Sequence, residues 1–381
     1  MSDKDGSNNK VIGLVSGNGV GKTTLSECLL FNSKTTDRLG RVDDKNTVSD
    51  FSPMEEEKGF SISSSIMHYK WKDFNINIID SPGYIDFVGQ SQSTIKVSDS
   101  VIMVIDAKSG IQAPTEMILD ILIEDPKPMF IVLNKMDLEN IEFFKIVEDI
   151  RSTYNINLVP ITIPVGSGEN FSQIVDILQN KAYQYKEGTF TGVKTDIDPV
   201  MKDQLAKYNS ELIESIVETN DELLNKYLEG KKIEDSVLSN IFKKAVVSRD
   251  VIPVFAVSAA KNSGIDLLMD YINILLPSPL DMPPIKAKII EKDEEVSIKP
   301  SFDGPPLAYV FKTMADPYIG KLTIFRIFSG TFKSGENYRV SSEEKPFKFG
   351  NLFKLQGKKQ IETSEATCGD IVAVSKLMKI T

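Results

Sequence analysis

A glycine-rich segment near the start of the chain has the residue types that bind phosphate groups. Three glycines occur between positions 17 and 21, after the β-branched run Val11 to Val15. Backbone N–H groups in such a loop, and at the start of the helix that it opens, can surround phosphate oxygens. Lys22 would reach the β- and γ-phosphates, and the Thr23 hydroxyl would ligate Mg²⁺. The residues expected around the phosphates are Ser16, Gly17, Asn18, Gly19, Val20, Gly21, Lys22, Thr23 and Thr24.

An acidic turn follows another buried run, Ile76 to Ile79. The carboxylate of Asp80 can hold the coordination shell of a Mg²⁺ ion, and the backbone amide of Gly83 can sense a γ-phosphate. Taken alone this motif is weak, because an aspartate followed by proline and glycine is also a common turn.

A third motif, Asn134 to Asp137, comes directly after the apolar run Phe130 to Leu133. A carboxylate at Asp137 accepts from guanine N1–H and the 2-amino group, and adenine offers no matching donors. Polar groups left unpaired in such a site can enforce roughly 10⁴ to 10⁵ discrimination. Lys135 can lie along the base plane, and Asn134 can tie this loop to the phosphate loop. Backbone amides of a fourth segment would complete the base pocket, at Ser258, Ala259 and Ala260.

Each motif has a plain structural alternative. The first position of the usual phosphate-loop pattern holds Ser16 in place of glycine, and a glycine-rich turn can be without function. Four motifs in this order, each at the end of an expected strand, argue against coincidence. They predict a site for GTP or GDP with Mg²⁺; an ATP-dependent enzyme would require Asn134 to Asp137 to be accidental.

Short β-branched runs alternate with helical patterns, which is typical of a parallel α/β sheet with a phosphate loop. Ligands bind such sheets at the carboxyl ends of the strands. We expect an edge strand at His68 to Trp71. The buried strands are expected at Val11–Val15, Ile76–Ile79, Val101–Ile105, Met129–Leu133 and Val254–Val257.

The remaining patterns predict three further segments. A helical insertion is expected over residues 158–250, with Asp198 as a helix cap and Pro199 at the first helical position. It divides the nucleotide-binding domain into residues 1–157 and 251–282. A proline-rich linker follows at 283–304, and alternating apolar residues with glycine turns predict an antiparallel β-barrel at 305–381. The barrel pattern reaches Thr381 without a closing element, so we expect a fragment of a longer chain.

Composition limits the class of protein. The chain has 381 residues with 41% hydrophobic and 26% charged, and no apolar run reaches the roughly 20 residues that cross a bilayer. The polar start, Met1 to Lys10, does not resemble a signal peptide. The two cysteines, Cys28 and Cys368, are far apart, which favours a reduced, cytoplasmic protein. A net charge of −10 argues against simple electrostatic coating of nucleic acid, and we expect neither DNA nor a membrane as partner, although the last 75 residues carry an excess of Lys and Arg.

The chain resembles the translational GTPases, and within them elongation factor G. Residues Ile76 to Phe87 closely match the switch II region of that family, and Glu55 to Ile62 match its switch I. Glu222 to Gly230 is similar to part of the subdomain that distinguishes elongation factor G from elongation factor Tu. Leu276 to Pro279 and the expected β-barrel also align. The resemblance implies the fold, Mg²⁺ with GTP as cofactor, and the ribosome as partner, through rRNA and ribosomal proteins. We also expect a monomer.

Several positions depart from the family pattern. Tyr84 stands where the family has the histidine that orients the attacking water. A tyrosine hydroxyl can donate or accept one hydrogen bond but cannot become a cation. Ser61 replaces the switch I threonine and keeps a hydroxyl for Mg²⁺, while Gly19 replaces an aspartate of the phosphate loop. Asn18 and Phe60 replace the two apolar residues that flank the approach of the water.

These departures affect hydrolysis and spare the nucleotide-binding motifs. We therefore expect catalysis to involve Lys22, Gly83 and Tyr84, and Mg²⁺ to be held by Thr23, Ser61 and Asp80. The predicted function is a ribosome-associated GTPase with slow or differently controlled hydrolysis. The alternatives are ordinary hydrolysis through the Tyr84 hydroxyl, a GTP-binding switch with little turnover, and a relative of ribosome-protection proteins or release factors.

Overall fold

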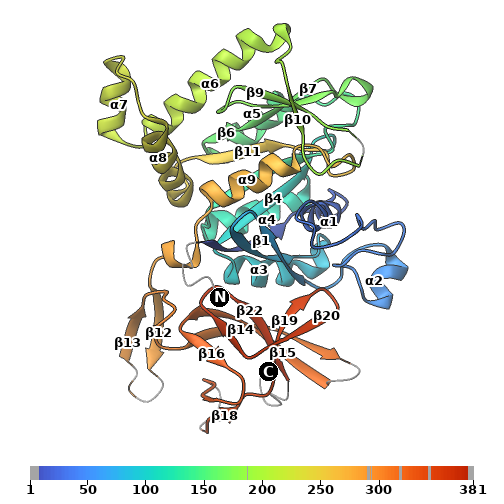
Figure 1. The fold of residues 1–381 in the computed structure, drawn as a ribbon, viewed down its shortest axis with the longest axis vertical. Coiled ribbons are helices and arrows are strands. Elements are labelled where there is room, and N and C mark those ends of the chain that lie inside the picture. Colours follow the sequence, from blue (N-terminus) through green and yellow to red (C-terminus); the bar gives the residue numbers. More distant parts are fainter. Residues whose placement is uncertain are drawn as a thin grey trace.

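The computed structural model describes residues 8–186, 188–289, 292, 294–316, 320–341 and 345–375. Figure 1 shows three parts stacked along the long axis of the molecule: a central α/β part, an insertion on one side and an antiparallel domain on the other. Among the described residues, no helix combines the length and the apolar character needed to cross a bilayer.

The central part is a seven-stranded sheet with the strand order β2-β3-β1-β4-β5-β11-β6. All neighbouring strands are parallel except β2, which pairs antiparallel with β3 at one edge. The five expected buried strands and the expected edge strand are confirmed. The strands are β1 (Asn9–Val15), β2 (Ser65–Trp71), β3 (Phe74–Asp80), β4 (Ser100–Asp106), β5 (Met129–Asn134), β6 (Leu158–Pro160) and β11 (Ile252–Ala256).

Helices cover this sheet, which explains its nearly continuous apolar strands. Every residue of β4 is buried, as expected for a parallel strand covered on both faces. Five helices pack around the sheet and enclose one large apolar core. They are α1 (Lys22–Asn32), α3 (Val88–Val97), α4 (Ala113–Glu124), α5 (Phe143–Tyr154) and α9 (Ile265–Leu275).

The strand directions place four loops at one edge. Strands β1, β3, β5 and β11 are all parallel, so the segments that follow them meet at the carboxyl edge of the sheet. These segments are the phosphate loop, the turn that begins at Asp80, the loop that begins at Asn134, and the loop around Ser258. The four motifs are therefore neighbours in space although they span about 240 positions of sequence.

The insertion differs from its expected form. Helices account for its second half, at α6 (Lys202–Val217), α7 (Asp221–Leu228) and α8 (Asp235–Ser248). The first half is a four-stranded antiparallel sheet of β7 (Thr162–Val165), β8 (Gln173–Asp176), β9 (Lys181–Gln184) and β10 (Val193–Thr195). Strand β6 pairs with β11, so the central sheet extends past residue 157. These strands have three or four residues each, too few for alternation to register as a pattern.

The start of α6 also differs from its expected form. Asp198 and Pro199 were expected to cap and begin this helix, but a 3₁₀ turn, η4 (Pro199–Met201), comes first. The helix proper begins at Lys202 with Met201 at its N-cap, and no side chain caps it. Proline suits the first turn of an α-helix or a 3₁₀ helix, because the backbone N–H groups there make no hydrogen bond within the helix.

The linker is more structured than expected, since β12 (Ile285–Ile289) and β13 (Glu294–Ile298) pair as a hairpin within residues 283–304.

The second domain is antiparallel, as expected, with the five-stranded order β14-β15-β22-β19-β20. Its described pairings include no ladder from β14 to β20 that would close a barrel, and residues 376–381 lie outside the described part. The strands of this sheet are β14 (Leu307–Asp316), β15 (Gly320–Ser329), β19 (Leu352–Gln356), β20 (Lys359–Thr363) and β22 (Ile371–Ser375). Two further two-stranded sheets pair β16 (Thr331–Lys333) with β21 (Glu365–Thr367), and β17 (Asn337–Tyr338) with β18 (Phe347–Lys348).

The second domain packs on the central part through an apolar surface. Leu322, Ile324 and Ala373 of its sheet share a buried cluster with Val11 and Ile79 of the central sheet. This shared core fixes the second domain next to the strands that carry the phosphate loop and the Asp80 turn.

Candidate nucleotide-binding site

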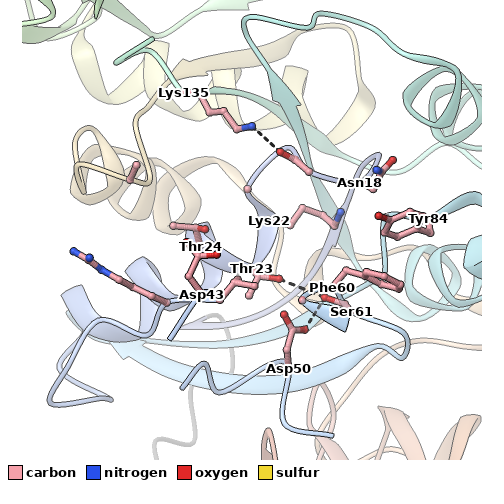
Figure 2. Close-up of a pocket in the computed structure, with 17 residues that line it drawn as sticks. Asn18, Lys22, Thr23, Thr24, Asp43, Asp50, Phe60, Ser61, Tyr84 and Lys135 are labelled. Atoms are coloured by element: carbon pink, nitrogen blue, oxygen red, sulfur yellow. Dashed lines mark hydrogen bonds between the residues drawn. The ribbon is translucent and has the colours of Figure 1, made fainter. Parts of the chain in front are cut away.

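The four loops enclose a cavity of about 740 Å³ at the carboxyl edge of the sheet. Figure 2 shows Lys22, Ser61 and Tyr84 around it, with Lys135 at the opposite end. Its lining residues are Asn18, Gly19, Gly21, Lys22, Thr23, Thr24, Arg41, Val42, Asp43, Asp50, Gly59, Phe60, Ser61, Gly83, Tyr84, Lys135 and Ala260.

The phosphate loop depends on a glycine where the chain enters α1. Gly21 is the N-cap of this helix and has φ 92°, in the left-handed region. A Cβ atom there would lie 2.5 Å from Asn134 Nδ2, so both the backbone angle and the space require glycine. The start of α1 therefore faces the cavity, where its unpaired N–H groups suit phosphate oxygens.

Lys22 is the buried cation of the loop. Its Nζ donates to the Gly17 carbonyl at 2.9 Å, and only 7% of the residue is exposed. Burial lowers the pKa of Lys22, and the nearby carboxylate of Asp80 opposes that change. Phosphate groups beside the ammonium would favour its charged form. Gly83 closes over this lysine, since a Cβ atom at Gly83 would lie 2.6 Å from Lys22 Nζ.

Five oxygen-bearing side chains gather below the phosphate loop. Ser61 Oγ donates to Asp50 Oδ1 at 2.6 Å and lies 3.4 Å from Thr23 Oγ1, as Figure 2 shows. Ser26 Oγ donates to Asp80 Oδ2 at 3.2 Å. One oxygen of Asp80 and one of Asp50 are buried without a hydrogen-bond partner in the described residues. Hard oxygen ligands of this kind fit Mg²⁺.

Burial of the Asp80 carboxylate raises its pKa, with Lys22 as the main opposing charge. A divalent cation beside it would favour the ionised form. The residues present therefore fit a Mg²⁺ ion that is bound together with a polyphosphate.

Ser61 is positioned by a short helix, α2 (Pro53–Lys58). Ser52 caps this helix and forms a reciprocal capping box with Glu55. The other oxygen of the buried Glu55 carboxylate accepts from the Ile62 and Ser63 amides, at 2.9 and 3.1 Å. One carboxylate thus joins both ends of the segment that presents the Ser61 hydroxyl.

The base end of the site is built from two loops. Asn134 Nδ2 donates to the Val20 carbonyl at 2.9 Å, and its Oδ1 accepts from the Ala259 amide at 2.9 Å. The expected tie between the Asn134 motif and the phosphate loop is therefore present. Ser258 Oγ donates to Asp137 Oδ1 at 2.5 Å, which fixes that carboxylate from the last loop.

Lys135 extends over the phosphate loop. Its Nζ donates to the Gly19 carbonyl at 2.6 Å and to Asp106 Oδ2 at 2.8 Å. Because the side chain is anchored at both contacts, its alkyl part is held along the wall of the cavity (Figure 2).

Tyr84 forms part of the cavity wall and is 36% exposed. Its ring packs against Phe60 with centroids 4.3 Å apart. In Figure 2 the Tyr84 hydroxyl points toward the part of the cavity that holds the Lys22 ammonium. That hydroxyl forms no hydrogen bond within the described part of the chain.

The structure brings together most of the sequence-predicted residues. The cavity lining does not include eight of them, which lie in the same four loops: Ser16, Gly17, Val20, Asp80, Asn134, Asp137, Ser258 and Ala259. Asp50 was missed, although it touches the Ser61 hydroxyl. No motif marked it, because an aspartate that follows a serine is also an ordinary turn residue. Arg41, Val42, Asp43 and Gly59 were also missed.

A phosphate loop between β1 and α1, with a guanine-type recognition loop after β5, defines a P-loop protein of the GTPase class. Comparison with known proteins agrees with this class. The model of the elongation factor Tu GTP-binding domain matches residues 7–278, and that of elongation factor G domain 2 matches residues 305–381. The chain therefore belongs to the translational GTPases, of the elongation factor G type.

Two relatives show the extent of the similarity. Elongation factor G 2 of Syntrophomonas wolfei is 35% identical over 363 residues, which are 95% of this chain and 52% of that protein. A crystal structure of a Thermus thermophilus protein superimposes with a TM-score of 0.86 at 28% identity, over 97% of this chain and 53% of that one. The chain thus spans about half the length of these relatives.

Proposed function

We propose that the protein binds GTP and GDP with Mg²⁺ in this cavity and hydrolyses GTP to GDP and phosphate as a ribosome-associated factor. The observation that supports this most is the convergence of the four loops, with Asp137 held by Ser258 at the base end and Lys22 buried at the phosphate end. The ribosome as partner, the cytoplasmic location and the monomeric state are proposed from family membership.

Hydrolysis is in-line attack of a water oxygen on the γ-phosphorus, which breaks the bond to the β–γ bridging oxygen and leaves GDP and phosphate. Lys22 stabilises the negative charge that builds on the leaving oxygen. The Gly83 amide donates to a γ-phosphate oxygen. Thr23, Ser61 and Asp80 would hold Mg²⁺, which neutralises phosphate charge when bound.

Tyr84 is proposed to orient the attacking water through its hydroxyl. Phe60 supports the ring from one side, and the hydroxyl is directed toward the cavity (Figure 2). A phenol makes one hydrogen bond to the water and stays neutral, whereas a histidine at this place can also become a cation. We therefore expect slower hydrolysis than a histidine would support.

The test is GTP hydrolysis with and without ribosomes, for the native protein, Tyr84→His and Tyr84→Phe. We expect ribosomes to stimulate the native protein, Tyr84→His to raise the stimulated rate by about tenfold or more, and Tyr84→Phe to lower it. Lys22→Ala serves as the inactive control. Strong native activity that Tyr84→His does not increase would show that Tyr84 orients the attacking water as well as a histidine does.

A GTP-binding switch with little turnover is the second candidate, and the Tyr84 substitution is the feature that favours it. In that case native hydrolysis stays near background even with ribosomes, while nucleotide binding is normal. A relative of ribosome-protection proteins or release factors would show hydrolysis that ribosomes stimulate, but it would not promote translocation. An assay of translocation therefore separates such a relative from an elongation factor.

A further inference from the structure

A lysine of the second domain reaches into the segment that carries Ser61. Lys312 lies on β14, next to a register irregularity between Val310 and Lys312. Its Nζ donates to Ser63 Oγ at 2.5 Å and to the Ser64 carbonyl. Burial lowers the pKa of this ammonium to about 8, and the nearby Glu55 carboxylate opposes the shift. The two contacts join the antiparallel domain directly to the metal-binding end of the site.

The contacted residues lead to both sides of the site. Ser63 is two positions from Ser61, and its amide is one of the two that the buried Glu55 carboxylate accepts from. Ser64 Oγ donates to Gln90 Oε1 on α3 at 3.1 Å. Because α3 follows the turn that contains Gly83 and Tyr84, the Ser64 hydrogen bond connects the Ser61 segment to the helix after that turn.

The second domain also touches the beginning of the same segment. The Gly357 amide, in the turn between β19 and β20, donates to the Ile66 carbonyl at 2.9 Å. A Cβ atom at Gly357 would lie 2.0 Å from the Val48 carbonyl oxygen, so this turn is in close contact with the chain just before Asp50. Residues 48–66 are thus in contact with the second domain near both ends.

We propose that Lys312 is a positioning residue of the nucleotide site, which holds the Ser61 hydroxyl in place for the GTP-bound state. This rests on the proposed function, because Ser61 is the proposed metal ligand on the γ-phosphate side. Segments of this kind are ordered by γ-phosphate and metal contacts in GTPases and released after hydrolysis. By holding that segment in place, Lys312 lowers the conformational entropy that is lost when the γ-phosphate of GTP orders it. Lys312 therefore strengthens GTP binding and leaves GDP binding nearly unchanged. By linkage, bound GTP strengthens the contact between the two domains.

The experiment measures dissociation constants for a non-hydrolysable GTP analogue and for GDP, both with Mg²⁺. The variants are Lys312→Met and the matched control Lys354→Met, whose ammonium bonds Asp370 within the second domain at 2.9 Å. We expect Lys312→Met to weaken binding of the GTP analogue about tenfold, the size expected for one charge-assisted hydrogen bond. GDP binding should stay within about twofold of native, and Lys354→Met should change neither constant.

A second variant tests the same contact through its other partner. Ser63→Ala removes an acceptor of the Lys312 ammonium from the other side and should shift the ratio of the two constants in the same direction. Equal losses for both nucleotides, or no change in the ratio for either variant, would overturn the positioning role. Failure of the native protein to bind either guanine nucleotide would instead contradict the proposed function itself.

Discussion

We propose that the Asp137 carboxylate selects the base, and a second loop fixes the position of that carboxylate. Ser258 holds one oxygen of this carboxylate at 2.5 Å, while the other oxygen has no hydrogen-bond partner in the described residues. The held oxygen limits rotation of the side chain, so its acceptors are oriented before the base arrives. A preorganised acceptor loses little entropy on binding, and guanine supplies the two donors that it needs.

We predict that Asp137→Asn exchanges guanine for xanthine recognition. The amide loses two charge-assisted acceptor contacts to guanine, so GTP affinity should fall about 10² to 10⁴-fold. Xanthine has a carbonyl in place of the 2-amino group, and the new amide can donate to it. Competition of GTP and XTP for the variant measures the change, and a variant that still prefers GTP would show that Asp137 does not contact the base.

At this scale the motif residues were predictable and the residues that support them were not. Asn134 and Asp137 could be identified because fixed spacing after a strand indicates their chemistry. Asp50 and Glu55 act through folded contacts with Ser61 and the amides that follow it. Those contacts depend on how residues 47–64 fold across the cavity, and no pattern in the sequence specifies that path.

The start of α1 shows how one element depends on another. Gly21 adopts a left-handed angle at the helix N-cap and lies against Asn134 from the loop after β5. The phosphate loop and the base loop can approach only because this position has no Cβ atom. The strand-to-helix junction therefore sets the distance between the phosphate and base ends of the site.

We predict that Gly21→Ala destabilises the protein by about 1–3 kcal/mol, because an alanine is strained at this angle and its Cβ displaces Asn134. Nucleotide affinity should fall as well, since the displaced Asn134 also bonds the Ala259 amide. Gly89→Ala is the control, because a Cβ atom on that α3 glycine meets nothing within 4 Å. Urea unfolding and GTP titration check both effects; equal behaviour of the two variants would refute the argument.

Elements were predictable where their patterns were long. The parallel strands and the three helices of the insertion have enough turns or apolar positions to show a period. Strands β6 to β10 have only three or four residues each. The buried residues of β6 to β9 pack against elements that are distant in the sequence, and β10 is exposed. Pairings such as β6 with β11 join residues about 94 positions apart, which local patterns cannot indicate.

The whole molecule is held together by a mixed apolar and ionic interface. Arg326 of β15 donates to Asp99 Oδ1 at 2.6 Å and to the Val97 carbonyl at the end of α3. The two charged side chains are 1% and 3% exposed. Burial alone raises the pKa of Asp99, and the Arg326 charge opposes that change. Such a pair gives the interface a specific geometry, although its net stabilisation is small.

We predict that Arg326→Met costs about 3–5 kcal/mol of unfolding free energy, because the Asp99 charge is left buried and unpaired. The double variant Arg326→Met with Asp99→Leu should recover most of that loss, since neither charge is then buried. Urea unfolding of both variants measures the difference. A double variant that is as unstable as the single one would show that the pair itself stabilises the interface.

The central claim is that the cavity at the carboxyl edge of the sheet binds a guanine nucleotide with Mg²⁺. Calorimetric titration of the native protein with GTP, GDP and ATP, each with Mg²⁺ and again with a chelator, tests it most directly. We predict tight binding of both guanine nucleotides, at least about 10⁴-fold weaker binding of ATP, and weaker GTP binding without the metal. Binding of ATP as tight as that of GTP, or no binding of either, would contradict the assignment of this site.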